Sequence, residues 1–209
     1  MTEFAFAEGV AGPRKQPTQA RSKHTVAAIL EATLRVLDEV GGPALTTTHV
    51  AEVAGVSVGT LYQYFPNRDA LINALLADHL EAAISAVERE CEAALAARLP
   101  IPEAAARVVR AFLAVKATRA AASRIMNKAF GIGMLDDRPL VQAAAHRAHR
   151  ALARLLSGGG EPDPALLARA TIACGALEGI VRQAISDDPE QLHDPVWVEQ
   201  VVKIATALA

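Results

Sequence analysis

The sequence has few cysteines and no obvious export or membrane segment. Only Cys91 and Cys174 occur, far apart in the chain, so a disulfide framework is not expected. No uncharged apolar run approaches the roughly 18 residues that cross a bilayer. No N-terminal segment combines a charged start, an apolar stretch and a small-residue cleavage site. We therefore expect a cytosolic protein with no membrane partner.

Aromatic residues and excess charge are also scarce. Aromatics make up 4% of the chain, and the net charge is −2, which argues against an unselective polyanion binder. Hydrophobic residues, many of them alanine, make up 52%, and alanine is the best helix former. Positive charge is concentrated between residues 12 and 30, which hold Arg14, Lys15, Arg21 and Lys23 and no carboxylate. That stretch is either a solvated tail or a basic arm.

The apolar residues follow helical spacing along most of the chain. A stripe from Val26 to Val40 ends at Gly41-Gly42-Pro43, and no segment shows the alternation of a strand. The pattern predicts an all-α protein of about nine helices. After two short helices within 46–65, the expected helices cover roughly 71–98, 103–117, 121–130, 140–156, 164–185 and 195–208.

Residues 46–65 carry the most informative pattern. Thr46 can cap a short helix whose buried side holds Val50 and Val53. Gly55 supplies the left-handed conformation at the end of that helix, and Ser57 caps the next one. Two short helices joined by a tight glycine turn are typical of a DNA-reading helix-turn-helix.

The second short helix has a core side and an exposed side. Leu61 and Phe65 lie four apart and are expected to face the core. Gly59 would let a phosphate approach the backbone N–H groups, Gln63 could read adenine, and Val58 could touch a thymine methyl. The residues expected on the exposed side and its margins are Val58, Gly59, Thr60, Tyr62, Gln63 and Tyr64.

The stretch Ala54-Gly55-Val56-Ser57-x-Gly59-Thr60-Leu61-Tyr62-x-Tyr64-Phe65 resembles the signature of the tetracycline-repressor (TetR) family. The resemblance includes the preceding helix and Asn67-Arg68-Asp69-x-Leu71, about 50 residues in all. Beyond residue 75 only the length and helical layout agree. His49 and Val58 depart from common versions, so the base preference does not carry over. The resemblance implies DNA contacts from Thr47, Thr48, Val58, Gly59, Thr60, Tyr62, Gln63, Tyr64 and Arg68. We expect Lys23 and the rest of the basic stretch to supply further positive charge at the DNA.

The same resemblance implies an organisation and a function. We expect a flexible basic arm (1–20), a three-helix DNA-binding domain (21–68) and a helical effector-binding and dimerisation domain (69–209). The protein would bind a palindromic operator as a homodimer, respond to a largely apolar small molecule, and need no metal or cofactor. In this family the last two helices form the dimer bundle, which implies an interface at Gly175, Ala176, Gly179, Val198 and Val202. The alternative is packing within one subunit.

Several residues allow either a functional or a purely structural interpretation. The apolar residues Phe112, Met126, Phe130 and Met134 could line an effector pocket or belong to the core. His79 could be a pocket group or a buried core histidine. His146 and His149 could hold a metal or lie on an exposed polar face. Glu178 could meet a basic partner across an interface or face water.

Two rival functions stay open. A helical enzyme would use His79, His146 or Glu178, although the sequence shows no acid–base pair, activated nucleophile or phosphate loop. A helical adaptor would carry a vestigial reader motif. Neither rival explains the 46–65 pattern, so we expect a transcriptional regulator that is not an enzyme.

Overall fold

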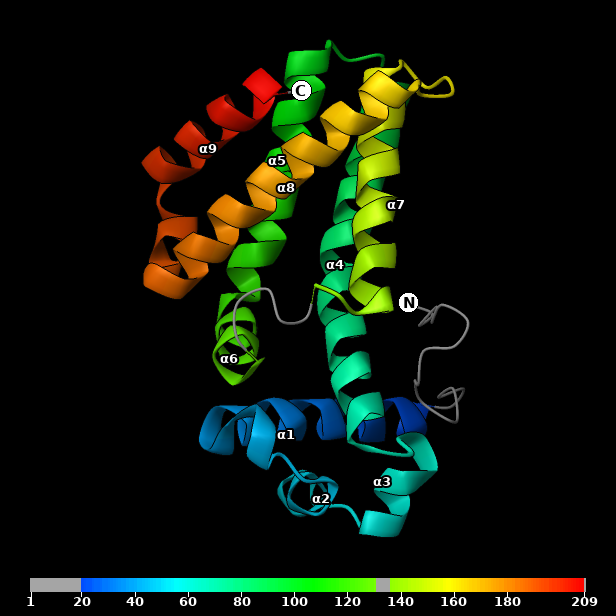
Figure 1. Ribbon diagram of the computed structural model, residues 1–209, viewed down its shortest axis with the longest axis vertical. Helices are drawn as coiled ribbons and strands as arrows, with labels where there is room; N and C mark the ends of the chain where they lie inside the picture. Colours follow the sequence, from blue (N-terminus) through cyan, green and yellow to red (C-terminus); the bar gives the residue numbers. More distant parts are fainter. Residues whose placement is uncertain (1–19, 131–135, 209) are drawn as a thin grey trace. The chain divides into compact units, whose positions relative to one another are not determined.

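The computed structural model describes residues 20–130 and 136–208, and within them every regular element is helical (Figure 1). This confirms the all-α prediction with about nine helices. The elements are α1 (Ala20–Ala44), α2 (Thr47–Ala54), α3 (Val58–Tyr64), α4 (Arg68–Ala96), α5 (Ile101–Thr118), α6 (Ala120–Phe130), α7 (Pro139–Leu156), α8 (Pro164–Asp187), the short 3₁₀ helix η1 (Pro189–His193) and α9 (Pro195–Leu208).

The chain forms two compact units, and each is built from separate stretches of sequence. Unit 1 comprises Met1–His79 and Arg124–Gln142; unit 2 comprises Leu80–Ser123 and Ala143–Ala209. These units do not coincide with the predicted functional segments 21–68 and 69–209, which stay a prediction. Most of the predicted basic arm lies outside the described residues.

Unit 1 is organised around the apolar side of α1. Ile29, Val36 and Leu37 of that helix are buried, as the sequence pattern predicted, whereas Val40 at the end of the predicted stripe is exposed. The expected end of the helix is also present, because Gly41 leaves the helical conformation with φ 77° and ψ 171°. Although the helical assignment continues to Ala44, this kink separates its last turn from the long helix before it.

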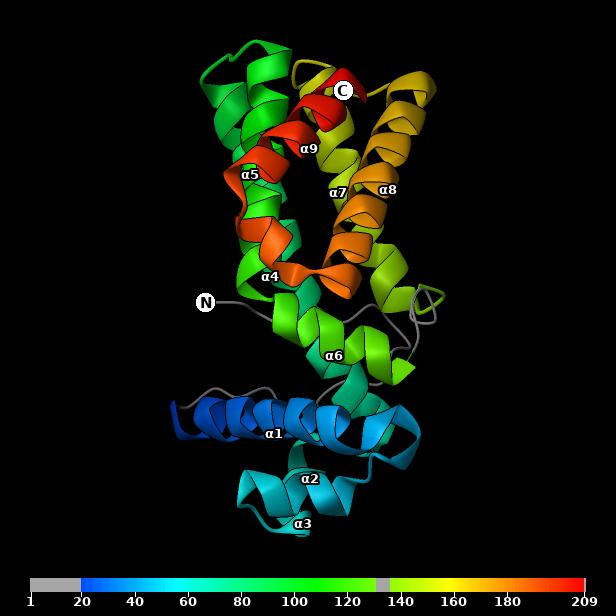
Figure 2. The ribbon, with the colours of Figure 1, turned by 90° about the vertical axis from the view of Figure 1, so that its left-hand side faces the viewer.

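Unit 2 is a bundle whose core lies among α4, α5, α7, α8 and α9 (Figure 2). Its largest fully buried side chains are Leu113 of α5, Leu155 of α7, and Val181 and Ile185 of α8. Asp163 caps α8 by accepting a hydrogen bond of 2.8 Å from the Leu166 backbone N–H, and Pro164 follows at the first helical position, where its missing N–H costs nothing.

A two-carboxylate clamp connects α7 to α4 within unit 2. The Arg147 guanidinium donates to Glu81 at 2.7 and 3.1 Å and to Glu88 at 2.9 and 2.6 Å. These bonds hold the pKa of the Glu81 carboxyl below its usual value, in spite of an opposing effect of burial. Planar bidentate pairs of this kind fix geometry as well as charge, so the clamp sets the register of α7 against α4.

Candidate nucleic-acid interface

Hydroxyl side chains cap both short helices of the 46–65 segment. The Thr46 hydroxyl accepts a hydrogen bond of 3.2 Å from the His49 backbone N–H at the start of α2. The Ser57 hydroxyl accepts one of 3.0 Å from the Thr60 backbone N–H at the start of α3. Each cap satisfies a backbone donor that the helix itself leaves without a partner. Both predicted caps are therefore confirmed.

A tight turn at Gly55 joins the two helices. Gly55 has φ 67° and ψ 29°, and its N–H donates to the carbonyls of Ala51 and Glu52. A side chain at this left-handed position would crowd the backbone, which explains the glycine. Two short capped helices with a glycine turn form the predicted helix-turn-helix geometry.

The buried sides of α2 and α3 hold the pair together. Val50, Ala51, Leu61 and Phe65 are buried almost completely. Ala51 is small, which allows the second helix to cross closely. Val53, expected on this buried side, is only half-buried. The pair therefore rests on four well-buried side chains, and its other side is left to solvent.

The predicted DNA contacts differ in their exposure. Thr48, Gly59, Tyr62 and Gln63 are exposed, as is Lys23 on α1, whereas Thr47, Val58, Thr60 and Arg68 are half-buried. Some hydroxyls already have partners within the motif. The Thr47 hydroxyl lies 3.0 Å from the Tyr62 hydroxyl, and the Ser57 and Thr60 hydroxyls lie 2.8 Å apart. These hydrogen bonds between neutral hydroxyl groups fix the positions of the Tyr62 and Thr60 side chains.

Tyr64 requires a correction. It was expected on the exposed side of α3, but it is only 9% exposed. Tyr64 lies three residues after Leu61, and residues with this spacing share one face of a helix. It therefore belongs to the core side of α3, and Tyr62 is the exposed tyrosine of the motif.

Arg68 has a partner inside unit 1 that the sequence did not reveal. Its guanidinium donates to the backbone carbonyl of Gly42 near the end of α1. Arginine carries five N–H donors, so this bond leaves others for a phosphate. A Cβ on Gly42 would lie 2.5 Å from the Ala129 carbonyl oxygen of α6. This glycine thus permits a close approach of α6 to the end of α1, a tertiary constraint without a local signal.

The described part of the helix-turn-helix region carries no excess of positive charge. Four basic and four acidic side chains lie between residues 20 and 68. Arg35 is paired with Glu31 on the exposed face of α1, and His49 lies 3.9 Å from Glu39. Contact with DNA by this region would therefore depend on hydroxyls, amides and backbone N–H groups more than on charge. Arg14 and Lys15 lie outside the described residues.

The predicted effector residues belong to both units. His79 and Met126 are buried and Phe130 is half-buried in unit 1, Phe112 is buried in unit 2, and Met134 lies outside the described residues. Their role in binding an effector stays a prediction.

The two surface histidines of α7 show no metal-binding arrangement. His146 and His149 meet edge to face, with ring centroids 6.3 Å apart. Burial and the neighbouring His146 lower the pKa of His149. Among the described residues, no group of three or more His, Cys, Asp or Glu side chains could hold a metal. No metal site is therefore assigned to the histidine pair.

The predicted dimer residues also divide into two sets. Gly175 and Gly179 are exposed, and a Cβ on either would meet open space. Val202 is buried in the core of unit 2, and Val198 packs against that core. The structure thus corrects the placement of Val202, which cannot offer its side chain to a partner. The exposed large apolar residues of α8 and α9, which the sequence reading missed, are Leu167, Ile172, Val196, Ile204 and Leu208.

Comparisons with known proteins match both parts of the chain. Residues 29–75 match the family described as bacterial regulatory proteins, tetR family, and residues 100–208 match the tetracyclin repressor-like C-terminal domain. The HTH-type transcriptional regulator BetI of Burkholderia cenocepacia is 38% identical over 68 residues, 32% of this chain and 35% of that protein. This chain thus matches about a third of the length of that curated relative.

Solved structures share the fold over nearly the whole chain. The fatty acid degradation regulator FadR from Bacillus halodurans has a TM-score of 0.67 at 16% identity, covering 92% of this chain and 96% of its own. A TetR-family transcriptional regulator from Streptomyces coelicolor has a TM-score of 0.59 at 25% identity, covering 88% of this chain and 96% of its own.

Proposed function

This chain belongs to the TetR family of bacterial regulatory proteins, which are helix-turn-helix transcriptional regulators, and on that premise we propose that it is a repressor. It binds a near-palindromic operator as a homodimer, and a small-molecule effector releases it. The observation that carries the proposal is the capped α2–α3 pair with Tyr62 and Gln63 exposed on its outer side.

Reading of the operator is assigned to α3 and the start of α2. Gln63 can form a bidentate pair with adenine in the major groove. Exposed Thr48 and Tyr62 can bond phosphates through their hydroxyls, and Gly59 leaves backbone N–H groups open to a phosphate. Because one such reader touches few bases, two copies related by a two-fold axis are needed for specific binding.

The first test is an electrophoretic shift assay with the DNA upstream of the gene itself, at several salt concentrations. Specific binding that weakens steeply with salt is expected. Gln63→Ala should weaken binding roughly ten- to hundredfold and relax the preference at one base position. Gln142→Ala is the matched control, because Gln142 is an exposed glutamine of α7. No specific binding at low salt, or equal effects of the two substitutions, would contradict the proposal.

The homodimer is proposed to form through α8 and α9. Five of the seven exposed large apolar residues in the described chain lie on these two helices. On α8, the exposed positions Ala168, Ile172, Gly175 and Gly179 follow one another at intervals of three and four, so they share one face of the helix. Glycines on that face would let a second helix approach closely. An exposed apolar face of this kind is typical of a protein–protein interface.

Length and composition alone would also allow α4 and α8 to cross a membrane. The apolar 18-residue stretch of α4 is 72% buried inside the protein, as in the core helix of a water-soluble domain. The corresponding stretch of α8 is only 17% buried. We assign the exposed face of α8 to a second copy of the chain because the family match covers residues 100–208.

Release by an effector completes the proposal. The effector is expected to bind among helices α4 to α7 and to shift α4, whose first residue is Arg68. A change in the separation of the two readers would then empty the operator. The effector must favour the released state by several kcal/mol to do so. If effector-saturated protein kept full operator affinity, this part of the proposal would be wrong.

A further inference from the structure

We propose that unit 2 recognises an apolar molecule by one anionic group, a carboxylate or its equivalent, which binds Lys116 of α5 in exchange for Glu178 of α8. This inference rests on the proposed function, because it names the chemical class of the effector. It is carried by an ion pair whose two partners differ sharply in burial.

Lys116 holds a positive charge inside unit 2. Its side chain is only 8% exposed, its ammonium nitrogen donates to Glu178 Oε1 at 2.9 Å, and the same nitrogen lies 5.2 Å from the centre of the Phe112 ring. A buried ammonium is costly unless an anion is paired with it. An anion is therefore required next to Lys116, whichever molecule supplies it.

Glu178 is the more easily displaced partner. Its side chain is 37% exposed, so a change of rotamer can return its carboxylate to water at small cost. Lys116 has no comparable route, because it lies against Phe112 and is itself buried. The cation is thus fixed, and the carboxylate beside it can be exchanged. An ion pair that only stabilises the fold would not require one buried and one partly exposed partner.

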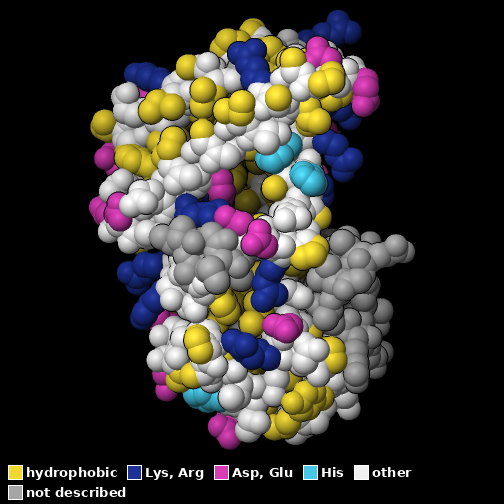
Figure 3. Space-filling model, in the orientation of Figure 1, with side chains coloured by type: hydrophobic (Ala, Val, Ile, Leu, Met, Phe, Trp, Pro, Cys, Tyr) yellow, Lys and Arg dark blue, Asp and Glu magenta, His cyan; other side chains and the backbone are white. Residues whose placement is uncertain are grey.

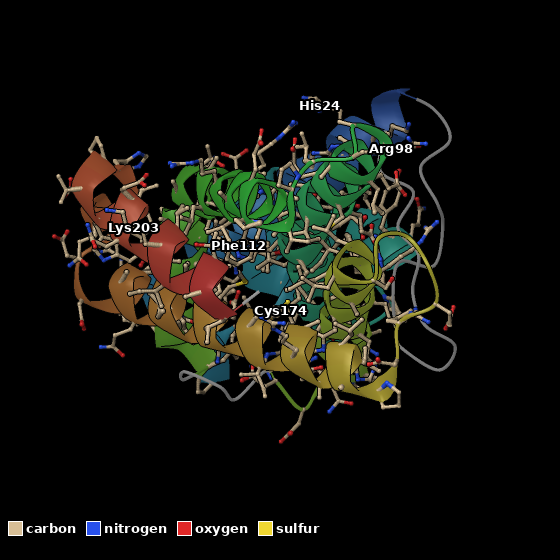
Figure 4. The ribbon with its side chains drawn as sticks, turned by 90° about the horizontal axis from the view of Figure 1, so that it is seen from above. His24, Arg98, Phe112, Cys174 and Lys203 are labelled. Atoms are coloured by element: carbon tan, nitrogen blue, oxygen red, sulfur yellow. The ribbon has the colours of Figure 1, made fainter. Side chains whose placement is uncertain are left out.

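The surroundings of the pair provide an apolar contact surface. Phe112 and Lys116 lie four residues apart on α5, as Cys174 and Glu178 do on α8, so each pair shares one face of its helix. Phe112 and Cys174 pack into the same apolar cluster, and Figure 4 shows both among the packed helices of unit 2. The surface is hollowed below α8, between α4 and α5, with hydrophobic side chains in its depth (Figure 3).

A ligand with an apolar body and an anionic end fits these features. Its body would contact Phe112 and the neighbouring core, and its anion would satisfy Lys116 through a charge-assisted hydrogen bond. A cationic ligand fits less well, since its charge would lie beside the fixed ammonium and the two would repel each other. The expected class is therefore a monoanionic amphiphile.

Direct binding to the purified full-length protein, without DNA, tests this inference. The probes are decanoate, decan-1-ol and decylammonium, which share one apolar chain and differ in the charge of the head group. Isothermal calorimetry below the micelle concentration should show decanoate binding at least about tenfold more tightly than the alcohol, as expected for one hydrogen bond to a charged group. Equal binding of all three, preference for decylammonium, or no binding would overturn the inference.

Three variants test whether the carboxylate of decanoate binds Lys116. Lys116→Met should remove the preference for decanoate while leaving decanol binding unchanged. Glu178→Gln should strengthen decanoate binding severalfold, because it removes the competing carboxylate and keeps the lysine. Lys128→Met is the matched control, since that lysine is 74% exposed in unit 1. If Lys116→Met alone fails to fold, the double variant Lys116→Met/Glu178→Gln removes both charges. A Glu178→Gln protein that is less stable and binds decanoate no better would show that the ion pair only stabilises the fold, and would overturn the inference.

Measurement of operator binding distinguishes failure of the anion site from failure of the proposed regulatory function. Decanoate binding that depends on Lys116 but leaves operator affinity unchanged supports the anion site and contradicts effector release through it. Release of the operator by decanoate with equal potency in wild-type protein and Lys116→Met overturns the anion site and leaves the regulatory proposal standing.

Discussion

Two glycines of the helix-turn-helix, four residues apart, serve different purposes. Gly55 has a positive φ that permits the turn, and its missing Cβ would meet nothing within 4 Å. Gly59 is an exposed residue of α3, where a Cβ would meet only the Ser57 hydroxyl, at 3.8 Å. The first glycine is required by the backbone. We attribute the second to the approach of DNA.

Alanine at these two positions should therefore have opposite effects on folding. Gly55→Ala is expected to lower the free energy of unfolding by about 1–2 kcal/mol, because alanine resists the left-handed conformation. Gly59→Ala should raise it by about 0.5–1 kcal/mol through better helix propensity, yet weaken operator binding. Urea unfolding and the shift assay measure the two effects. Stability changes of the same sign, or full operator affinity in Gly59→Ala, would contradict the assignment.

Local chemistry explains which residues were predictable. The caps at Thr46 and Ser57 and the turn at Gly55 depend on neighbours within three or four positions, so the sequence alone revealed them. The bond from Arg68 to Gly42 and the pairing of Lys116 with Glu178 depend on partners 26 and 62 positions away. Tyr64, by contrast, follows Leu61 by three positions, a local spacing that already indicates its core side. Glu178 was expected to meet a basic partner across an interface or to face water, and its partner Lys116 lies in its own chain.

At the scale of helices, the clamp of Arg147 on Glu81 and Glu88 joins α7 to α4 through hydrogen bonds to two carboxylates. No local sequence pattern indicates that two carboxylates of α4 meet Arg147, because they lie 59 and 66 positions away from it. Helix ends were predicted within a few residues because glycine, proline and capping residues mark them. The exception is η1, which the sequence reading missed; its five residues are too few for a periodic pattern.

Removal of the clamp should cost stability in a pH-dependent way. Arg147→Met is expected to lower the free energy of unfolding at neutral pH by on the order of 1 kcal/mol, since the partners are partly exposed. The native pKa of Glu81 is lowered, so its contribution is fully present above the unfolded-state pKa and is lost as pH falls from that value through the lower native pKa. The difference between wild type and variant should therefore shrink between about pH 5 and about pH 3.

Thermal unfolding across this range provides the measurement, with Arg150→Met as the matched control because Arg150 is exposed on the same helix. A difference that is constant with pH, or equal losses in both variants, would show that the clamp does not act through the Glu81 charge.

At the scale of the whole molecule, α8 and α9 hold most of the exposed large apolar side chains of the described residues. Ile172 is 65% exposed and Val196 is 69% exposed. The helical pattern predicted these helices, and family resemblance pointed to them as an interface. The resemblance did not show that Val202 is buried while Val196 is exposed, because this depends on how α9 packs against the core of unit 2.

Negative charges on the exposed face of α8 and α9 should prevent the proposed dimer from forming. Ile172→Asp/Val196→Asp is expected to convert a dimer to a monomer in sedimentation velocity and to lower operator affinity by more than tenfold, because the two readers then bind independently. Val40→Asp is the matched control, since Val40 is an exposed apolar residue of unit 1. A wild-type protein that sediments as a monomer and partitions into lipid vesicles would contradict the assignment of this face to a second copy.

The division of the chain into interleaved units has a consequence for synthesis and for protein engineering. The chain passes between units after residues 79, 123 and 142, and each passage lies inside a helix, α4, α6 or α7. A fragment that stops after α4 would lack the part of unit 1 contributed by residues 124–142, so the amino-terminal reader cannot be excised as a contiguous piece with its full set of contacts. On the ribosome, unit 1 likewise cannot be completed until residue 142 has emerged, by which time much of unit 2 has already been translated.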